Sequence, residues 1–156
     1  MQEQLKEAFG ILKQTIPMRD DIIDMLDDAD LEYSLEGNPT IGELLRRMGD
    51  IQHSYINSFE TFKQNFSDFS DDDSLAKSTD KLKTMFSELD EKLENALEAI
   101  TDEQFKSQLI DRGFPMSIGA QLHTFREGIL TEVSKLSVYL RTMGKELPQQ
   151  VKDWIW

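Results

Sequence analysis

Apolar residues recur every three or four positions along nearly the whole of this 156-residue chain, and this spacing constrains its fold most strongly. Because successive residues of an α-helix are about 100° apart, such spacing places the apolar side chains on one helical face. The pattern predicts four long helices and shows no strand signal and no internal repeat. Since each helix has one apolar face to bury, we predict an all-α four-helix bundle, as a single domain over residues 1–156.

The first predicted helix contains a proline. The ring of Pro17 removes a backbone donor and disfavours helical conformation in the preceding residue, so we predict a break or kink there. A turn-rich connection is expected over residues 30–39. The apolar stripe of this first helix consists of Leu5, Phe9, Leu12, Ile16, Ile22, Ile23, Met25 and Leu26.

The second helix is predicted from Thr40 to about Phe66. Thr40 and Glu43 have the spacing of a capping box, in which the side chain of each residue accepts a hydrogen bond from the backbone N–H of the other. The polar, acidic and Ser-rich residues 65–79 should form a long connection. The stripe of the second helix consists of Ile41, Leu44, Leu45, Met48, Ile51, Tyr55, Phe59, Phe62 and Phe66.

Two further long helices are expected after this connection. Thr101 and Gln104 have the spacing of a second capping box, which predicts that a short helix begins there, between the two long helices. Ser117 can cap the last long helix. Gly144 suits the position just beyond that helix, with Pro148 further on. The third stripe consists of Leu82, Met85, Phe86, Leu89, Leu93, Leu97 and Ile100. The fourth consists of Ile118, Leu122, Phe125, Ile129, Val133, Leu136, Leu140 and Met143.

Charge and cysteine content limit the classes of function. With 30 acidic and 17 basic residues the net charge is −13, which argues against nucleic acid or an anionic membrane as a partner. The absence of cysteine excludes disulfides, a thiolate nucleophile and Cys-ligated metals. No apolar run is long enough to span a bilayer, and the charged, amphipathic N-terminus lacks the apolar core of a signal peptide. We therefore expect a cytoplasmic protein.

The two histidines each have a carboxylate at helical spacing, as a metal site would require. His53 follows Asp50 by three residues, and His123 precedes Glu127 by four. On a helical wheel, however, all four lie about 120–200° from the apolar stripes. We therefore predict that both histidines are solvated surface residues.

Acidic runs over residues 20–30 and 71–73 lack the alternating oxygen ligands, central glycine and late glutamate of a calcium-binding loop. They are interpreted as a solvated helix face and a flexible connection. No catalytic serine motif and no glycine-rich phosphate loop is present.

Two segments resemble a known superfamily. Thr40–Phe62 (TIGELLRRMGDIQHSYINSFETF) resembles the second helix of DinB-like proteins, the superfamily that includes YfiT-type metal-dependent enzymes and thiol transferases. Lys135–Gly144 (KLSVYLRTMG), followed by Pro148, resembles the end of the family's fourth helix. The resemblance implies a four-helix bundle of up-down-down-up topology, a long crossover between the second and third helices, and a homodimer.

The resemblance also implies a position for a metal site. Family members that bind zinc or nickel carry one histidine on the second helix and a His-x-x-x-His pair on the fourth. Matched residue by residue, these positions fall on Arg47, Gly128 and Glu132, with Asp50 completing the second-helix pattern. None of the three is histidine, and a guanidinium cannot coordinate a cation. We therefore predict that the metal site is lost and that no metal cofactor is bound.

The replacements suggest an ion pair. We hypothesise that Arg47 and Glu132 meet where the metal would lie, with Gly128 making room for the arginine side chain. The alternative is that each side chain points separately into solvent.

Two classes of function follow from this interpretation. The first is a non-catalytic, metal-free bundle that binds a small molecule or a protein, with an anionic ligand expected if a pocket contains Arg47. The second is a hydrolase or thiol transferase with a rearranged site, built on Glu132 and a carboxylate such as Asp50. The residues around the expected cleft are Arg47, Asp50, Tyr55, Arg126, Glu132 and Tyr139.

The apolar tail from Val151 to Trp156 leaves a separate question open. Trp154 and Trp156 are residue types that anchor interfaces, but we expect them to pack across the end of their own bundle, with an interface as the alternative.

Overall fold

The computed structural model describes residues 3–156, which form α-helices, two short 3-10 helices and one small antiparallel sheet. The long helices of the bundle are α1 (Glu3–Lys13) with α2 (Ile16–Asp24), then α3 (Ile41–Thr61), α4 (Thr79–Glu98) and α6 (Ile118–Thr142). The shorter elements are η1 (Asp30–Glu32), η2 (Asp73–Lys77), α5 (Asp102–Ser107), β1 (Leu109–Asp111), β2 (Pro115–Ser117) and α7 (Gln149–Ile155).

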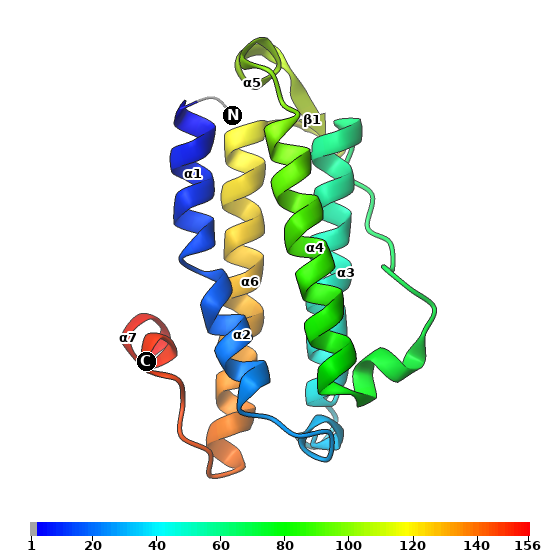
Figure 1. Ribbon diagram of the computed structural model, residues 1–156, viewed down its shortest axis with the longest axis vertical. Coiled ribbons are helices and arrows are strands. Elements are labelled where there is room, and N and C mark those ends of the chain that lie inside the picture. The colour runs from blue at the N-terminus through cyan, green and yellow to red at the C-terminus, as the bar shows by residue number, and fades with distance from the viewer. Residues whose placement is uncertain (1–2) are drawn as a thin grey trace.

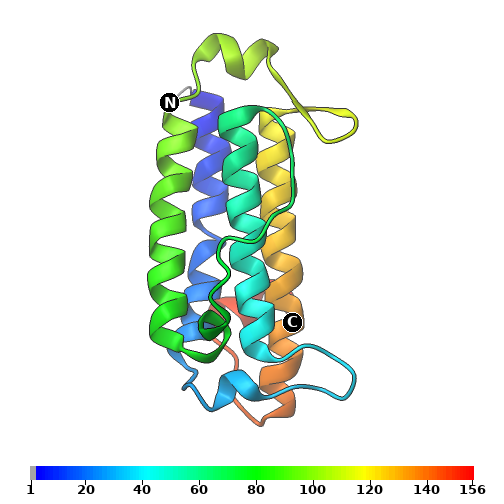
Figure 2. The same ribbon diagram turned by 90° about the vertical axis from the view of Figure 1, so that its right-hand side faces the viewer.

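The helices form a bundle with the predicted topology. The pair α1 and α2 descends in Figure 1, α3 and α4 both ascend, and α6 descends again. Because α3 and α4 run in the same direction, residues 62–78 must return along the length of the bundle, and Figure 2 shows this crossover lying over its side. The up-down-down-up arrangement places α3 between α4 and the antiparallel α6.

The predicted stripes form the core. In α6 every stripe residue from Ile118 to Leu140 is buried, and Met143 at its end is partly buried. The stripe of α4 is buried throughout its predicted length. Burial of these apolar faces is the main force that holds the helices together. Within residues 3–156 no helix has the combination of length and hydropathy needed to cross a membrane.

Most predicted helix ends are confirmed. Both capping boxes form, with Thr40 and Glu43 at the start of α3 and Thr101 and Gln104 at the start of α5. Ser117 caps α6, and Gly144 follows its end in the left-handed conformation that glycine permits (φ +74°). The first helix is broken as predicted, with α2 starting immediately before Pro17.

The end of α3 differs from the prediction. The helix stops at Thr61 rather than near Phe66, because Phe62 takes a left-handed conformation (φ +57°). Beyond it the chain pairs with β1, as the Asp111 N–H donates to the Phe62 carbonyl and the Gln64 N–H to the Asp111 carbonyl. Phe66, counted in the predicted stripe, is consequently 65% exposed.

The β1–β2 hairpin was not predicted. It pairs Leu109 with Ser117 through Asp111 with Pro115, around a turn in which Gly113 has a φ of +86°. Strands of three residues are too short for apolar and polar residues to alternate visibly in the sequence. The sequence analysis therefore did not detect the two strands.

The C-terminal tail packs along the side of its own bundle. Figure 1 shows α7 beside α2 and α6 rather than across the bundle's end, so the predicted end cap is wrong. Val151 is buried, and the Trp156 indole N–H donates to the Ser137 hydroxyl at 2.8 Å. Arg126 lies over the ring of Trp154, 5.7 Å from its centre. Both tryptophans also keep a large exposed surface.

Candidate functional site

The predicted ion pair between α3 and α6 is present. Antiparallel packing brings Arg47 of α3 to the level of Glu132 of α6, where the arginine Nη2 donates to the glutamate Oε1 at 2.7 Å. Lys135, one turn further along α6, donates to the same oxygen at 2.8 Å. The Glu132 carboxylate therefore lies between two cations, one from each helix.

The two members of the pair differ greatly in exposure. The Glu132 side chain is 5% exposed, whereas 47% of the Arg47 side chain remains accessible. The second carboxylate oxygen, Oε2, is buried and accepts no hydrogen bond from any described residue. Burial of a carboxylate is costly unless cations compensate it, so the pair fixes how α3 and α6 meet more than it stabilises the bundle.

Gly128 lies one turn before Glu132 and faces α3. A Cβ atom at this position would meet Ile51 Cγ2 at 4.0 Å, an ordinary van der Waals contact, and no atom nearer. Alanine would therefore fit without displacing Arg47. The expectation that glycine is needed here to make room for the arginine is wrong.

A pocket of about 280 Å³ adjoins the pair on the crossover side. Its lining residues are Arg47, Asp50, Ile51 and Ser54 of α3 and Phe66, Ser67 and Asp68 of the crossover. The Asp50 Oδ1 accepts the Phe69 N–H at 2.8 Å, which fixes the crossover against the helix. Burial raises the pKa of Asp50, although this hydrogen bond works in the opposite direction.

Three other residues of the expected cleft lie elsewhere, and none lines this pocket. Tyr55 stacks on Phe125, with ring centres 4.9 Å apart, and its hydroxyl accepts from Arg112. Arg126 donates to the Thr15 hydroxyl at the break between α1 and α2. Tyr139 donates to the Pro39 carbonyl. The expected cleft is thus reduced to Arg47 and Asp50, with Glu132 behind them.

The histidines lie apart from this site. His123 is exposed, with Glu127 3.7 Å away on the same helix, as the wheel predicted. His53 is partly buried against Phe69, with ring centres 5.6 Å apart, because the crossover covers that face of α3. The prediction of a fully solvated His53 is therefore wrong.

The residues at the metal positions implied by the resemblance do not fit a metal ion. Glu132 offers one carboxylate, Gly128 has no side chain, and Arg47 has donors but no acceptor. One oxygen of Glu132, Oε1, already accepts hydrogen bonds from two cations. Across residues 3–156, no three histidine, cysteine, aspartate or glutamate side chains are grouped so as to hold a metal.

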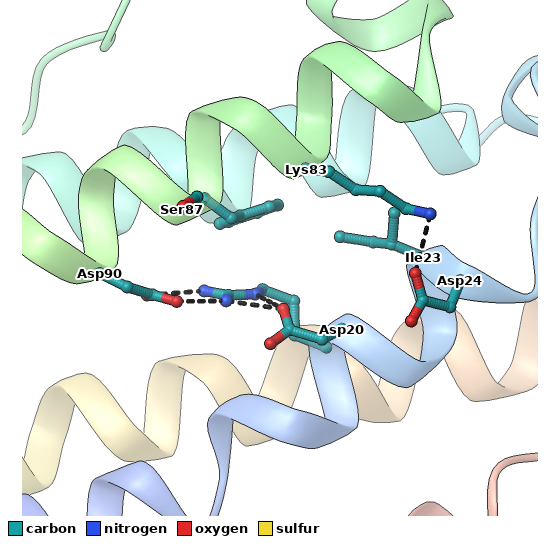
Figure 3. A pocket seen from close by; sticks show the side chains of 8 residues that line it. Asp20, Ile23, Asp24, Lys83, Ser87 and Asp90 are labelled. Atoms are coloured by element: carbon teal, nitrogen blue, oxygen red, sulfur yellow. Dashed lines mark hydrogen bonds and ion pairs between the residues drawn. The ribbon is translucent and has the colours of Figure 1, made fainter.

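A second charged cluster, which the sequence analysis missed, joins α2 to α4. Arg19 is 1% exposed and forms a two-pronged ion pair with Asp90, through Nη1 to Oδ1 at 3.1 Å and Nη2 to Oδ2 at 2.7 Å. Its Nε donates to Asp20, and Nη1 also donates to Gln52 of α3. Figure 3 shows Asp20 and Asp24 of α2 facing Lys83 and Asp90 of α4 across a pocket.

The Arg19 cluster corrects the interpretation of the first acidic run. Asp20 is partly buried rather than fully solvated, and burial raises its pKa against the attraction of Arg19. The available signal was position: Arg19 precedes Ile22 and Ile23 by three and four residues, so it lies on their apolar face. The guanidinium lies 4.2 Å from the centre of the Phe86 ring. All three of its nitrogens contact oxygen atoms of neighbouring side chains, which makes the cluster a structural link.

The fold was compared with known proteins. No family model matches the sequence, and no curated protein matches it significantly. Among solved structures, it is similar to the crystal structure of a DinB-like protein, YjoA, from Bacillus subtilis. The match has a TM-score of 0.67 and 22% sequence identity, and covers 89% of this chain and 96% of the other. The chain has the DinB-like fold.

Proposed function

We propose that this protein is a member of the DinB-like superfamily that has replaced its metal ligands, and that it acts by binding rather than by metal-dependent catalysis. The observation that supports this proposal is the ion pair between Arg47 and Glu132, two of the three positions at which the family resemblance would place metal ligands. Two of the three inherited ligand positions thereby neutralise each other. The third, Gly128, contributes no side chain.

The pocket beside the pair is what a binding function requires. Pockets for small ligands are concave and combine apolar walls with a few charged groups. Here Ile51 and Phe66 supply apolar surface, and Arg47 and Asp50 supply charge. A homodimer, a protein partner and a cytoplasmic location remain predictions from the sequence.

Elemental analysis of the purified full-length chain tests the proposal. We expect zinc and nickel contents far below one ion per chain, both as isolated and after incubation with either metal followed by dialysis. We also expect no change of melting temperature on adding a chelator, because no metal supports the fold. One equivalent of bound zinc or nickel would contradict the proposal. Activity on thiol-conjugation substrates that Glu132→Gln abolishes would instead favour a rearranged catalytic site.

A further inference from the structure

Arg47 and Asp50 are held apart although their spacing would let them pair. Residues three apart on a helix lie side by side, and opposite charges at that spacing commonly interact. Among the described residues there is no ion pair between these two. Arg47 instead reaches Glu132 on α6, and Asp50 accepts the Phe69 N–H of the crossover. One wall of the pocket therefore presents a guanidinium and a carboxylate that are not paired with each other.

Arg47 retains capacity to bind a ligand. A guanidinium has five N–H donors, and within residues 3–156 Arg47 donates one hydrogen bond, through Nη2. Nearly half of its side chain is exposed, and it lines the pocket. By contrast, every nitrogen of the buried Arg19 contacts a side-chain oxygen. Arg47 can thus receive a carboxylate in the two-pronged manner of Arg19 and Asp90 while it keeps Glu132.

The pocket also contains two carboxylates, which favour a cationic group. Asp50 and Asp68 both line it, and Asp50 uses one of its two oxygens, Oδ1, for the Phe69 N–H. Two carboxylates against one guanidinium disfavour a purely anionic ligand. The anionic ligand expected from Arg47 alone is therefore replaced by one that carries both charges.

The size and apolar part of the pocket limit the ligand further. Ile51 and the exposed Phe66 provide the apolar surface. The volume of about 280 Å³ is close to the lower end of the range for ligand pockets, about 300 Å³, and therefore suits a small ligand. A free amino acid with an aliphatic side chain has this size.

We propose that the pocket binds a free α-amino acid as a zwitterion. Its carboxylate pairs with Arg47, its ammonium group with Asp50 and Asp68, and its side chain packs on Ile51 and Phe66. This inference rests on the proposed function, because it requires Arg47 and Glu132 to be paired with each other instead of surrounding a metal. It goes further by naming the chemical class of the ligand.

Calorimetric titration of the full-length protein provides the test, with leucine, methionine and phenylalanine as probes. N-acetylleucine lacks the ammonium group and leucinamide lacks the carboxylate, so they are the matched controls. We expect at least one of the three amino acids to bind, and both leucine derivatives to bind about tenfold more weakly or not at all. Absence of binding for all three at concentrations up to about 10 mM would overturn the inference, as would equal affinity for the derivatives.

Two variants locate the ligand. Asp50→Asn keeps an oxygen for the Phe69 N–H but removes the charge, and Arg47→Met removes the guanidinium. Each should weaken binding about tenfold or more, whereas Asp153→Asn on the exposed face of α7 should not. Unchanged affinity in a folded Asp50→Asn protein would refute this location even if Arg47→Met failed to fold. A metal-free protein that binds no amino acid would overturn this inference alone, whereas stoichiometric metal would overturn the proposed function.

Discussion

Replacement of Arg19 by methionine should lower the free energy of unfolding by about 3 kcal/mol, and the melting temperature by about 6–12 °C. Removing one partner of a buried ion pair leaves the other without its counter-charge, and Asp90 would lose both of its arginine contacts. Gln52 and the face of Phe86 would lose the guanidinium as well. This loss of free energy of unfolding is at the lower end for buried ion pairs, because the Asp90 side chain is 30% exposed and water can partly replace Arg19. Thermal and urea unfolding followed by circular dichroism would measure both quantities.

Lys13→Met provides the matched control for Arg19→Met. The Lys13–Glu94 pair also links two helices of the bundle, but both side chains are about half exposed. Exposed pairs of this kind contribute less than about 1 kcal/mol. The free energy of unfolding of this variant should therefore be close to that of the native protein. Equal destabilisation by the two variants would mean that the burial of the Arg19 cluster has no energetic importance.

Gly42→Ala should lower the free energy of unfolding by about 2 kcal/mol, although alanine is the better helix former. Gly42 lies in the first turn of α3, where η2 of the crossover packs directly on the backbone. An added Cβ would lie 1.8 Å from the carbonyl oxygen of Ala76. Because the obstacle is backbone rather than a flexible side chain, η2 must move away from α3, and the cost of that displacement exceeds the gain in helix propensity. Chemical denaturation would measure the free energy of unfolding, and hydrogen exchange over residues 73–77 would show the displacement of η2.

Gly10→Ala is the control for this change because, within residues 3–156, no atom beyond its chain neighbours and its own helix backbone lies within 4 Å of the added Cβ. Gly10 is inside α1, so alanine should raise the free energy of unfolding by about 0.5–1 kcal/mol through its lower conformational entropy in the unfolded chain. The same substitution is thus expected to act in opposite directions at two helical glycines. A neutral or stabilising Gly42→Ala would show that the crossover does not pack tightly on α3.

The bundle was predictable because its causes are local. The stripes from Leu82 to Ile100 and from Ile118 to Leu140 follow the helical period, and Thr40, Thr101 and Ser117 are good N-caps in the sequence itself. The end of α3 was not predictable in this way. The sequence around Phe62 continues the helical stripe, and the helix stops there because the chain pairs with Asp111, which is distant in sequence.

In the candidate site too, some features could be predicted from the sequence and others depend on contacts between distant parts of the chain. The pairing of Arg47 with Glu132 was predicted because the resemblance fixed the register of α3 against α6. The pocket beside it could not be predicted, since Phe66 and Asp68 belong to a crossover whose path has no periodic signal. Arg19 was missed for another reason. Its position on the apolar face of Ile22 and Ile23 indicates burial, but its partner Asp90 is on a helix from a different part of the chain and could not be identified from spacing alone.

Zinc titration of a variant that restores three histidines tests the central claim most directly. The variant combines Arg47→His, Gly128→His and Glu132→His, which places His-x-x-x-His on one face of α6 opposite a histidine of α3. If these are the replaced ligand positions, the variant should bind one zinc ion per chain and melt at a higher temperature with zinc than without it. The native protein should show neither effect. Zinc binding that is equally weak in both proteins, or saturable binding by the native protein, would contradict the account.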